Sequence, residues 1–309
     1  METYCETVFK EQEIKMKKNT ATFQNPQHLV TVEWLYEQLD DPDIRIYDCT
    51  AHLLPHTIKS YMVGSGREDY NKAHIPGAGF LDLQEELSDN DSDFRFTFPT
   101  PEHFADVVGD HGLGDNSEIV LYSTTSPQWA TRIWWMLRTL GFENAKVLDG
   151  GLIRWLQKDY PTSTIPAKYP PSTFTPKLQP SLIVKKAEVE KAIGDETICT
   201  INALSNDQHR ALGGKVYGRP GRIAQSTNLP TVDLIDPGTN MFLPPDEIFK
   251  RFSQIGADKA ERILTYCGGG IAASATVMLL IMLGHENVGL YDNSMSEWAN
   301  DENLPMETG

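Results

Sequence analysis

Short apolar or aromatic runs alternate with longer, helix-length segments along most of the chain. The short runs predict buried strands at residues 44–47, 119–122, 263–266 and 288–291. The longer segments predict helices at residues 129–140 and 272–283. These helices end at Gly141 and Gly284, and glycine suits a helix C-cap. Strands that alternate with helices indicate an α/β fold whose mainly parallel sheets carry helices on both faces.

Five sequence blocks recur in the same order in the two halves of the chain. The first half carries them at residues 44–48, 74–78, 117–122, 140–144 and 148–155, and the second at 197–202, 222–226, 261–266, 283–287 and 290–298. Gly141 pairs with Gly284, and Trp155 with Trp298, at the same offset of 143 residues. Chance does not match five blocks in one order, so we expect two copies of one α/β unit.

A proline-rich segment separates the two copies. Five of the 17 residues at 160–176 are proline, which favours an extended, semi-rigid linker. The polar, unpatterned start of the chain predicts a flexible tail. We therefore expect a tail at 1–26, a first copy at 27–158, a linker at 159–181 and a second copy at 182–309.

Charge and composition exclude several classes of function. The chain has 27 Lys and Arg residues against 43 Asp and Glu, a net charge of -16, which opposes binding to nucleic acid. The longest aliphatic run, 277–283, is too short to span a bilayer, and the first 18 residues lack an apolar leader. The four cysteines form no C-x-x-C pair, so we expect neither a metal site nor a redox dithiol. A soluble, cytoplasmic protein without nucleic-acid or membrane partners is the expectation.

Cys267 is the candidate chemical centre. It follows a predicted strand and precedes three glycines and a predicted helix. Consecutive glycines let several N–H groups point toward one atom, and the helix adds its positive end. This environment should favour the thiolate, which is the reactive form of cysteine. The alternative is an inert, buried cysteine beside a tight turn. We favour the functional interpretation for Cys267, and the inert one for Cys5, Cys49 and Cys199.

These motifs resemble tandem rhodanese-type sulfurtransferases, which include thiosulfate and 3-mercaptopyruvate sulfurtransferases. The resemblance rests on His74-Ile-Pro-Gly-Ala, Val147-Leu-Asp-Gly-Gly-Leu-Ile-Arg-Trp, Tyr266-Cys-Gly-Gly-Gly-Ile-Ala and Leu290-Tyr-Asp-Asn-Ser-Met-Ser-Glu-Trp, and it spans about residues 29–305. It implies two rhodanese-like domains, of which the second is catalytic. Ser123 stands at the position of Cys267 in the first copy, and its loop lacks glycine.

The resemblance also implies a double-displacement mechanism without a cofactor. The Cys267 thiolate takes a sulfur from a small anionic donor and becomes a persulfide, and cyanide, a thiol or a protein cysteine accepts the outer sulfur. The N–H groups of the following loop would stabilise the thiolate and the persulfide. The loop residues are Gly268, Gly269, Gly270, Ile271 and Ala272.

The donor stays open between thiosulfate and 3-mercaptopyruvate. Thiosulfate-type loops in the family carry cationic side chains, whereas the loop after Cys267 is neutral and closer to the mercaptopyruvate type. Mercaptopyruvate enzymes, however, hold the substrate carboxylate with arginines, one of them in an Asp-x-Arg motif after a strand. The matching segment is Asn202-Ala-Leu204, so that arginine is missing.

A basic segment offers another way to bind an anion. Arg210, Lys215, Arg219 and Arg222 lie in a stretch without an acidic residue, between Gln208 and Val232. Arginine grips oxyanions through paired N–H groups, so Arg219 and Arg222 are predicted donor ligands, with Arg210 as a further candidate. The alternative is a solvated basic loop with surface ion pairs.

His74 is a further candidate from the first copy. It could donate a proton or contact the anion across the domain interface, with Glu68 and Asp69 orienting it. A capping or core histidine is the equal alternative.

Two other functions compete with sulfur transfer. Phosphatases of the same fold place an arginine six positions after the cysteine, but that position here is Ala273. The other alternative is a catalytically silent rhodanese-like binding or regulatory module, which the retained Cys267 opposes.

Two fused copies also predict a monomer or a weak dimer.

Overall fold

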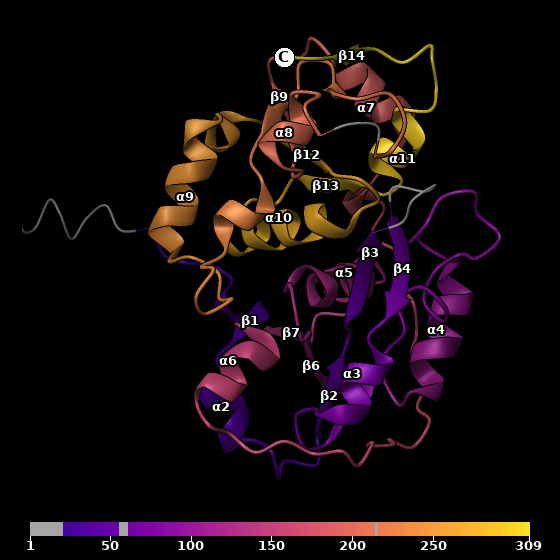
Figure 1. Ribbon diagram of the computed structural model, residues 1–309, viewed down its shortest axis with the longest axis vertical. Coiled ribbons are helices and arrows are strands. Elements are labelled where there is room, and N and C mark those ends of the chain that lie inside the picture. The colour runs from indigo at the N-terminus through magenta and orange to yellow at the C-terminus, as the bar shows by residue number, and fades with distance from the viewer. Residues whose placement is uncertain (1–20, 56–60, 214–215) are drawn as a thin grey trace, which may run out of the picture.

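The chain folds into two α/β units that are stacked on each other (Figure 1). The computed structural model describes residues 21–55, 61–213 and 216–309. The first unit contains β1 (Leu29–Val30), α2 (Val32–Glu37), β2 (Ile44–Asp48), β3 (Ala51–Pro55), β4 (Tyr61–Ser65), α3 (Arg67–Lys72), β5 (Ala78–Phe80), α4 (Pro101–Asp110), β6 (Glu118–Tyr122), α5 (Gln128–Thr139), β7 (Ala145–Leu148) and α6 (Gly151–Gln157).

The second unit repeats most of this order. It contains β8 (Ile183–Val184), α7 (Lys186–Ala192), β9 (Ile198–Asn202), α8 (Asn206–His209), β10 (Arg222–Ile223), β11 (Thr227–Asn228), α9 (Pro245–Gln254), β12 (Arg262–Tyr266), α10 (Ile271–Met282), β13 (Val288–Tyr291), α11 (Ser294–Trp298) and β14 (Met306–Glu307).

The two main sheets have the same strand order, which confirms the duplication. The first is β5-β2-β6-β7-β1, the second is β11-β9-β12-β13-β8, and every pairing in both is parallel. The four predicted strands and both predicted helices are present within two residues of their predicted bounds. Gly141 and Gly284 follow α5 and α10 with φ of 80° and 96°, the left-handed conformation that ends a helix.

Each sheet buries both of its faces. The faces turned toward the middle of the molecule share one apolar cluster, which includes α5 and α10. Separate clusters cover the outer faces, with Trp155 of α6 on the first sheet and Trp298 of α11 on the second. Eleven of the twelve residues of α10 are buried, as expected for a helix that is apolar on all sides. The shared cluster holds the two copies together.

In the described parts of the chain, only the first copy has an antiparallel hairpin beside its main sheet. Strands β3 and β4 pair outside the main sheet, and in Figure 1 they reach from the first unit toward the second. Residues 56–60, between these strands, lie outside the described residues. The hairpin brings first-copy side chains to the end of the second sheet.

The predicted tail and linker both contact the folded units. Residues 1–20 lie outside the described residues, but the N–H groups of Gln24 and Asn25 donate to the Met282 carbonyl at the end of α10. These two residues, expected in a flexible tail, are therefore bonded to the second copy. Residues 161–179 contain no regular helix or strand and lie along the first copy, where Tyr169 donates to the Gly77 carbonyl. The domain bounds stay a prediction.

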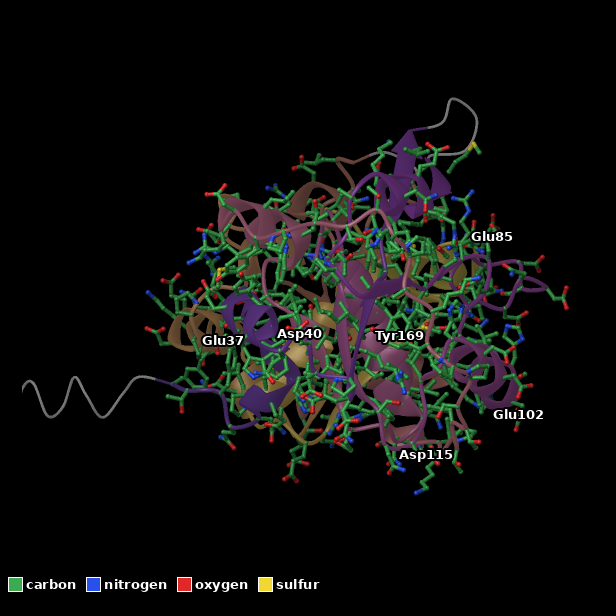
Figure 2. All side chains as sticks on the ribbon, turned by 90° about the horizontal axis from the view of Figure 1, so that it is seen from below. Glu37, Asp40, Glu85, Glu102, Asp115 and Tyr169 are labelled. Atoms are coloured by element: carbon green, nitrogen blue, oxygen red, sulfur yellow. The ribbon has the colours of Figure 1, made fainter. Side chains whose placement is uncertain are left out.

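The excess acidic charge lies at the surface. Figure 2 labels Glu37, Asp40, Glu85, Glu102 and Asp115, which are all exposed. No helix in the described parts of the chain has both the length and the apolar character needed to cross a bilayer.

Asp149 gives the domain interface a pH dependence. Its Oδ1 accepts from the Phe242 N–H of the other copy at 2.8 Å, and burial raises the pKa of Asp149 to about 7. The folded state then binds this proton more tightly than the unfolded chain, so its stability falls as pH rises from about 4 to 7. Asp149→Asn keeps the Oδ1 acceptor for the Phe242 N–H but has no ionisable group, so it removes this fall in stability. We expect the variant to raise the melting temperature at pH 8 by at least about 2 °C, and by less at pH 5. An equal change at both pH values would contradict this assignment.

Candidate active site

Cys267 lies directly after β12, at the carboxyl end of the central strand of the second sheet. Its side chain is buried and borders a cavity between the two copies. The start of α11 fixes the backbone around it. The Cys267 N–H donates to Ser294 Oγ at 3.0 Å, and the Met295 N–H donates to the Cys267 carbonyl at 3.1 Å. The nucleophile is therefore held on rigid elements.

The glycine loop leaves its N–H groups free. The Ser296 N–H and Oγ both donate to the Gly268 carbonyl, which turns that carbonyl toward α11. Gly270 has a φ of 77° and forms the N-cap of α10. Within the described residues, no N–H from 268 to 272 donates to another protein group. Five unpaired donors at a helix N-terminus next to a cysteine suit a thiolate or a persulfide anion.

The matching loop of the first copy is closed. Ser123 replaces the cysteine, and its hydroxyl donates to the Ser126 carbonyl. The Thr124 N–H donates to Thr50 Oγ1 at 2.8 Å, and the Gln128 N–H to Ser126 Oγ at 3.4 Å. The first copy thus has neither the nucleophile nor an equivalent set of free donors.

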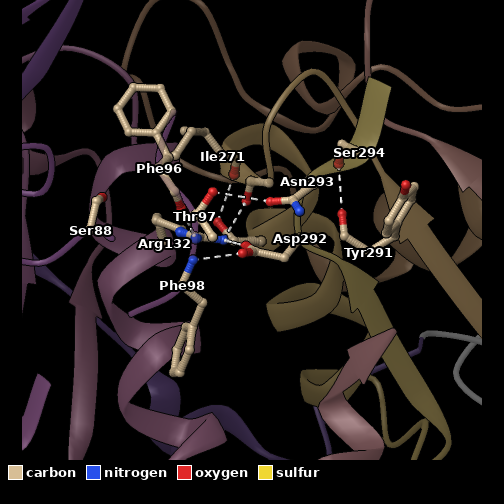
Figure 3. A network of polar contacts seen from close by, with 12 residues as sticks. Ser88, Phe96, Thr97, Phe98, Arg132, Ile271, Tyr291, Asp292, Asn293 and Ser294 are labelled. Carbon is tan, nitrogen blue, oxygen red and sulfur yellow. Dashed lines mark hydrogen bonds and ion pairs between the residues drawn. The ribbon is translucent and has the colours of Figure 1, made fainter. Parts of the chain in front are cut away.

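A buried arginine of the first copy supports the loop from behind (Figure 3). Arg132 of α5 forms an ion pair with Asp292, with 2.6 Å between Nη1 and Oδ1. Its Nη2 donates to the Phe96 carbonyl, and its Nη1 lies 3.5 Å from the Gly270 carbonyl. Asp292 Oδ2 also accepts from the Phe98 N–H at 2.7 Å. One fully buried guanidinium therefore connects α5, the segment at 96–98 and the glycine loop.

The cavity in front of Cys267 measures about 620 Å³ and is lined by both copies. The hairpin contributes His52 and Tyr61, and the second copy contributes Leu204 and Tyr217. Leu204 stands where the mercaptopyruvate-type motif has its arginine. None of the described residues that line this cavity is a lysine or an arginine.

The Tyr217 ring packs directly over Gly268. A Cβ added to Gly268 would overlap this ring, whereas one added to Gly269 would make only ordinary contacts, the nearest with the Arg95 carbonyl at 3.5 Å. Neither glycine has a positive φ, so alanine fits both backbones.

Gly268→Ala should therefore displace either Tyr217 or the loop. Because a displacement of 1 Å in an active site costs about 100-fold, we expect a loss of kcat/KM of about 10- to 100-fold. Gly269→Ala, the matched control, should change it by less than about threefold. Steady-state kinetics on both variants checks this, and equal effects would show that Tyr217 does not constrain the loop.

The structure does not bring the predicted arginines to Cys267. The Arg219 guanidinium donates to the Trp298, Ala299, Asp301 and Leu304 carbonyls. Arg222 pairs with Glu307 at 3.1 Å and donates to the Gly309 carbonyl. Arg210 is exposed, and none of the three lines the cavity. Lys215 lies outside the described residues. Carbonyl and carboxylate oxygens occupy Arg219 and Arg222, so neither is part of the proposed site.

His74 also lies apart from Cys267. Its ring is fully buried, with Nδ1 2.7 Å from the Tyr70 carbonyl and Nε2 3.0 Å from the Ile165 carbonyl. It does not line the cavity. Asp69, expected to orient His74, contacts His52 instead, at 3.0 Å. His74 thus has the core position that was its alternative interpretation.

Sequence reasoning missed the residues that shape the cavity. Tyr61, Phe96, Trp129 and Tyr217 carry no motif that marks them as site residues. Arg132 did carry a signal, since a charged residue inside a buried apolar helix needs a partner.

Comparisons with known proteins match nearly the whole chain. The model of the rhodanese-like domain matches residues 31–158 and 187–301. The 3-mercaptopyruvate sulfurtransferase of Escherichia coli strain K12 is 32% identical over 286 residues, which cover 90% of this chain and 97% of that protein. The thiosulfate sulfurtransferase of Mus musculus is 28% identical, covering 91% and 94%. The crystal structure of SseA from Escherichia coli, a 3-mercaptopyruvate sulfurtransferase, aligns with a TM-score of 0.76 at 30% identity, covering 86% and 98%.

Proposed function

The chain belongs to the family of rhodanese-like domain proteins, and from this premise we propose that it is a sulfurtransferase with Cys267 as its nucleophile. It moves a sulfur from 3-mercaptopyruvate or thiosulfate to a thiol or cyanide through a persulfide. Relatives with these two activities match it over nearly its whole length. The observation that carries the proposal is the position of Cys267 before five N–H groups, in the loop and first turn of α10, that have no partner among the described residues.

The first half-reaction loads the enzyme. The Cys267 thiolate attacks the donor sulfur and forms a new S–S bond. The C–S bond of 3-mercaptopyruvate breaks with release of the pyruvate enolate, which then takes a proton. With thiosulfate, the S–S bond breaks and sulfite leaves. The negative charge that stays on the enzyme lies on the outer sulfur, where the loop N–H groups of residues 268–272 stabilise it.

The second half-reaction returns the thiolate. A thiolate or cyanide attacks the outer sulfur, the S–S bond to Cys267 breaks, and its electron pair stays on the cysteine sulfur. The product is a persulfide or thiocyanate. No metal or organic cofactor takes part in either step. Ser123 and its closed loop give the first copy no equivalent chemistry, so its role is to support the loop and line the cavity.

We expect 3-mercaptopyruvate to be the better donor. Thiosulfate is a dianion, whereas 3-mercaptopyruvate carries one carboxylate charge when its thiol is protonated. Anions lose hydration in a cavity, and the described lining offers no lysine or arginine to compensate. The kcat/KM for 3-mercaptopyruvate should exceed that for thiosulfate by at least about tenfold.

Side-by-side steady-state kinetics with a common cyanide acceptor measures this preference. Lys59→Ala and Lys215→Ala serve as controls. Both lysines lie outside the described residues, in short segments whose neighbours in sequence, such as Tyr61 and Val216, line the cavity. A preference for thiosulfate that either substitution abolishes would contradict the neutral-site explanation.

The rival functions fit the site less well. Ala273, at the sixth position after Cys267, cannot bind a phosphate as the phosphatase arginine does. A silent binding module would not need an unobstructed nucleophile.

We further propose a reducing, cytoplasmic setting, since Cys49, Cys199 and Cys267 are all free. We also propose that the protein is a monomer or a weak dimer.

A further inference from the structure

The cavity is larger than either donor requires. At about 620 Å³ it is in the range of sites that enclose whole drug-sized ligands, whereas thiosulfate and 3-mercaptopyruvate have only five and seven non-hydrogen atoms. It opens at the edge formed by the hairpin and the second copy. Leu54 and Val232 line it there and are 50% and 62% exposed. Apolar side chains at an entrance suggest an apolar ligand, because exposing them to water is otherwise unfavourable.

Four aromatic rings from both copies form the walls. Phe96 and Trp129 meet edge to face with centroids 5.7 Å apart, and Tyr61 and Tyr217 do so at 6.0 Å. Such rings offer both faces and edges to another ring or to an alkyl chain. Burial raises the pKa values of Tyr61 and Tyr217, so both phenols stay uncharged at neutral pH.

The Phe96 wall is held in a costly conformation. Phe96 has a φ of 62°, in the left-handed region that bulky residues rarely adopt. Its carbonyl accepts from Arg132, which is anchored by Asp292. Strained residues persist where the surrounding structure holds them, and they gather at functional sites. The conformation that places this ring beside the cavity therefore lowers the stability of the fold.

Nearby charges are already neutralised or turned away. His52, the titratable histidine of the described lining, contacts Asp69 at 3.0 Å. The Arg95 guanidinium lies over the Tyr61 ring, 4.8 Å from its centroid, and donates to the Tyr61 carbonyl at 2.8 Å. Apart from His52, the described wall thus consists of aromatic, aliphatic and uncharged polar side chains, with the loop N–H groups at its end.

We propose that the sulfur acceptor is a thiol carried on an aromatic or long alkyl group that fills this cavity and has no charged group of its own. This inference rests on the proposed function. The acceptor thiolate attacks the outer sulfur of the Cys267 persulfide, and the enzyme S–S bond breaks. The cysteine leaves as thiolate, and the acceptor leaves as an alkyl or aryl persulfide. Each molecule of acceptor takes one sulfur, with no outside oxidant or reductant.

The test uses the full chain loaded with persulfide and freed of donor. Single-turnover discharge is followed with 2-phenylethanethiol, 2-mercaptoethanol and 2-mercaptoethanesulfonate, with rates corrected for the thiolate fraction. We expect saturation with 2-phenylethanethiol and a second-order constant at least about tenfold above those of the other two, since one methylene in an apolar pocket already discriminates by such a factor. Linear, equal rates for all three thiols, or faster discharge by the sulfonate, would overturn the inference.

A pair of variants tests the location. Leu54→Gln combined with Val232→Gln removes apolar surface at exposed lining positions. It should lower the constant for 2-phenylethanethiol by about three- to tenfold and leave that for 2-mercaptoethanol unchanged. Leu156→Gln is the matched control, because Leu156 is 50% exposed on α6 and does not line the cavity.

The two levels of proposal fail differently. If the protein forms no persulfide with either donor, the proposed function fails and this inference with it. If it forms the persulfide but shows no preference for 2-phenylethanethiol, or if Leu156→Gln acts like the double variant, only the acceptor class is wrong.

Discussion

Replacing Cys267 with serine is expected to lower kcat for sulfur transfer by about 10³-fold or more, because the reaction has no other route through this site. Serine keeps the size of the side chain but cannot carry a sulfane sulfur. The loop backbone, held by Ser294 and Met295, should stay in place. The melting temperature should therefore change little while steady-state turnover with 3-mercaptopyruvate and cyanide disappears.

Cys199 provides the matched control. It is a free cysteine, and burial raises the pKa of its thiol to about 11. It therefore stays a thiol at neutral pH. Cys199→Ser should retain turnover within about threefold, since it lies outside the cavity lining. If turnover survives in Cys267→Ser but falls in Cys199→Ser, the assignment of Cys267 as the nucleophile is wrong.

The second large effect is expected from Arg132. Arg132→Met should lower the free energy of unfolding by about 3–5 kcal/mol, because it leaves the Asp292 carboxylate, which is only 12% exposed, without its charged partner. The same change releases the Phe96 carbonyl and the support behind Gly270. Thermal and denaturant unfolding measure the loss of stability, and donor kinetics measure the effect on the loop.

The double variant Arg132→Met with Asp292→Leu separates the ion pair from simple packing. Removing both charges should recover much of the stability lost in the single variant, since no unpaired buried charge remains. Its activity should stay low if Arg132 positions the loop. A double variant that is no more stable than Arg132→Met would show that the loss comes from packing rather than from the buried charge.

Local patterns in the sequence were sufficient to predict the main strands and helices, the nucleophile and the duplication. The strands and the helices that end at Gly141 and Gly284 could be predicted because their apolar periodicity and C-caps are encoded within a few residues. Cys267 could be predicted for the same reason: strand, cysteine, three glycines and helix are consecutive in sequence. The duplication then required only that the two halves be compared.

The substrate side of the site depends on contacts that no local pattern specifies. Arg219 looked like an anion ligand because four cations lie close in sequence, but backbone carbonyls 79 to 85 residues away take up its donors. Tyr61 and Phe96 reach the cavity only because the first copy docks on the second. A sequence does not show which hydrogen bonds an arginine makes or which loops of another domain face a cysteine.

Intact-mass measurement of the persulfide tests the central claim most directly. Wild-type protein incubated with 3-mercaptopyruvate and then freed of donor should gain the mass of one sulfur atom, about 32 Da, located on Cys267 by peptide mapping. Cyanide should remove it. The same treatment of Cys267→Ser should give no gain. Wild-type protein that gains no sulfur from either 3-mercaptopyruvate or thiosulfate, or that gains it equally in Cys267→Ser, would contradict the account.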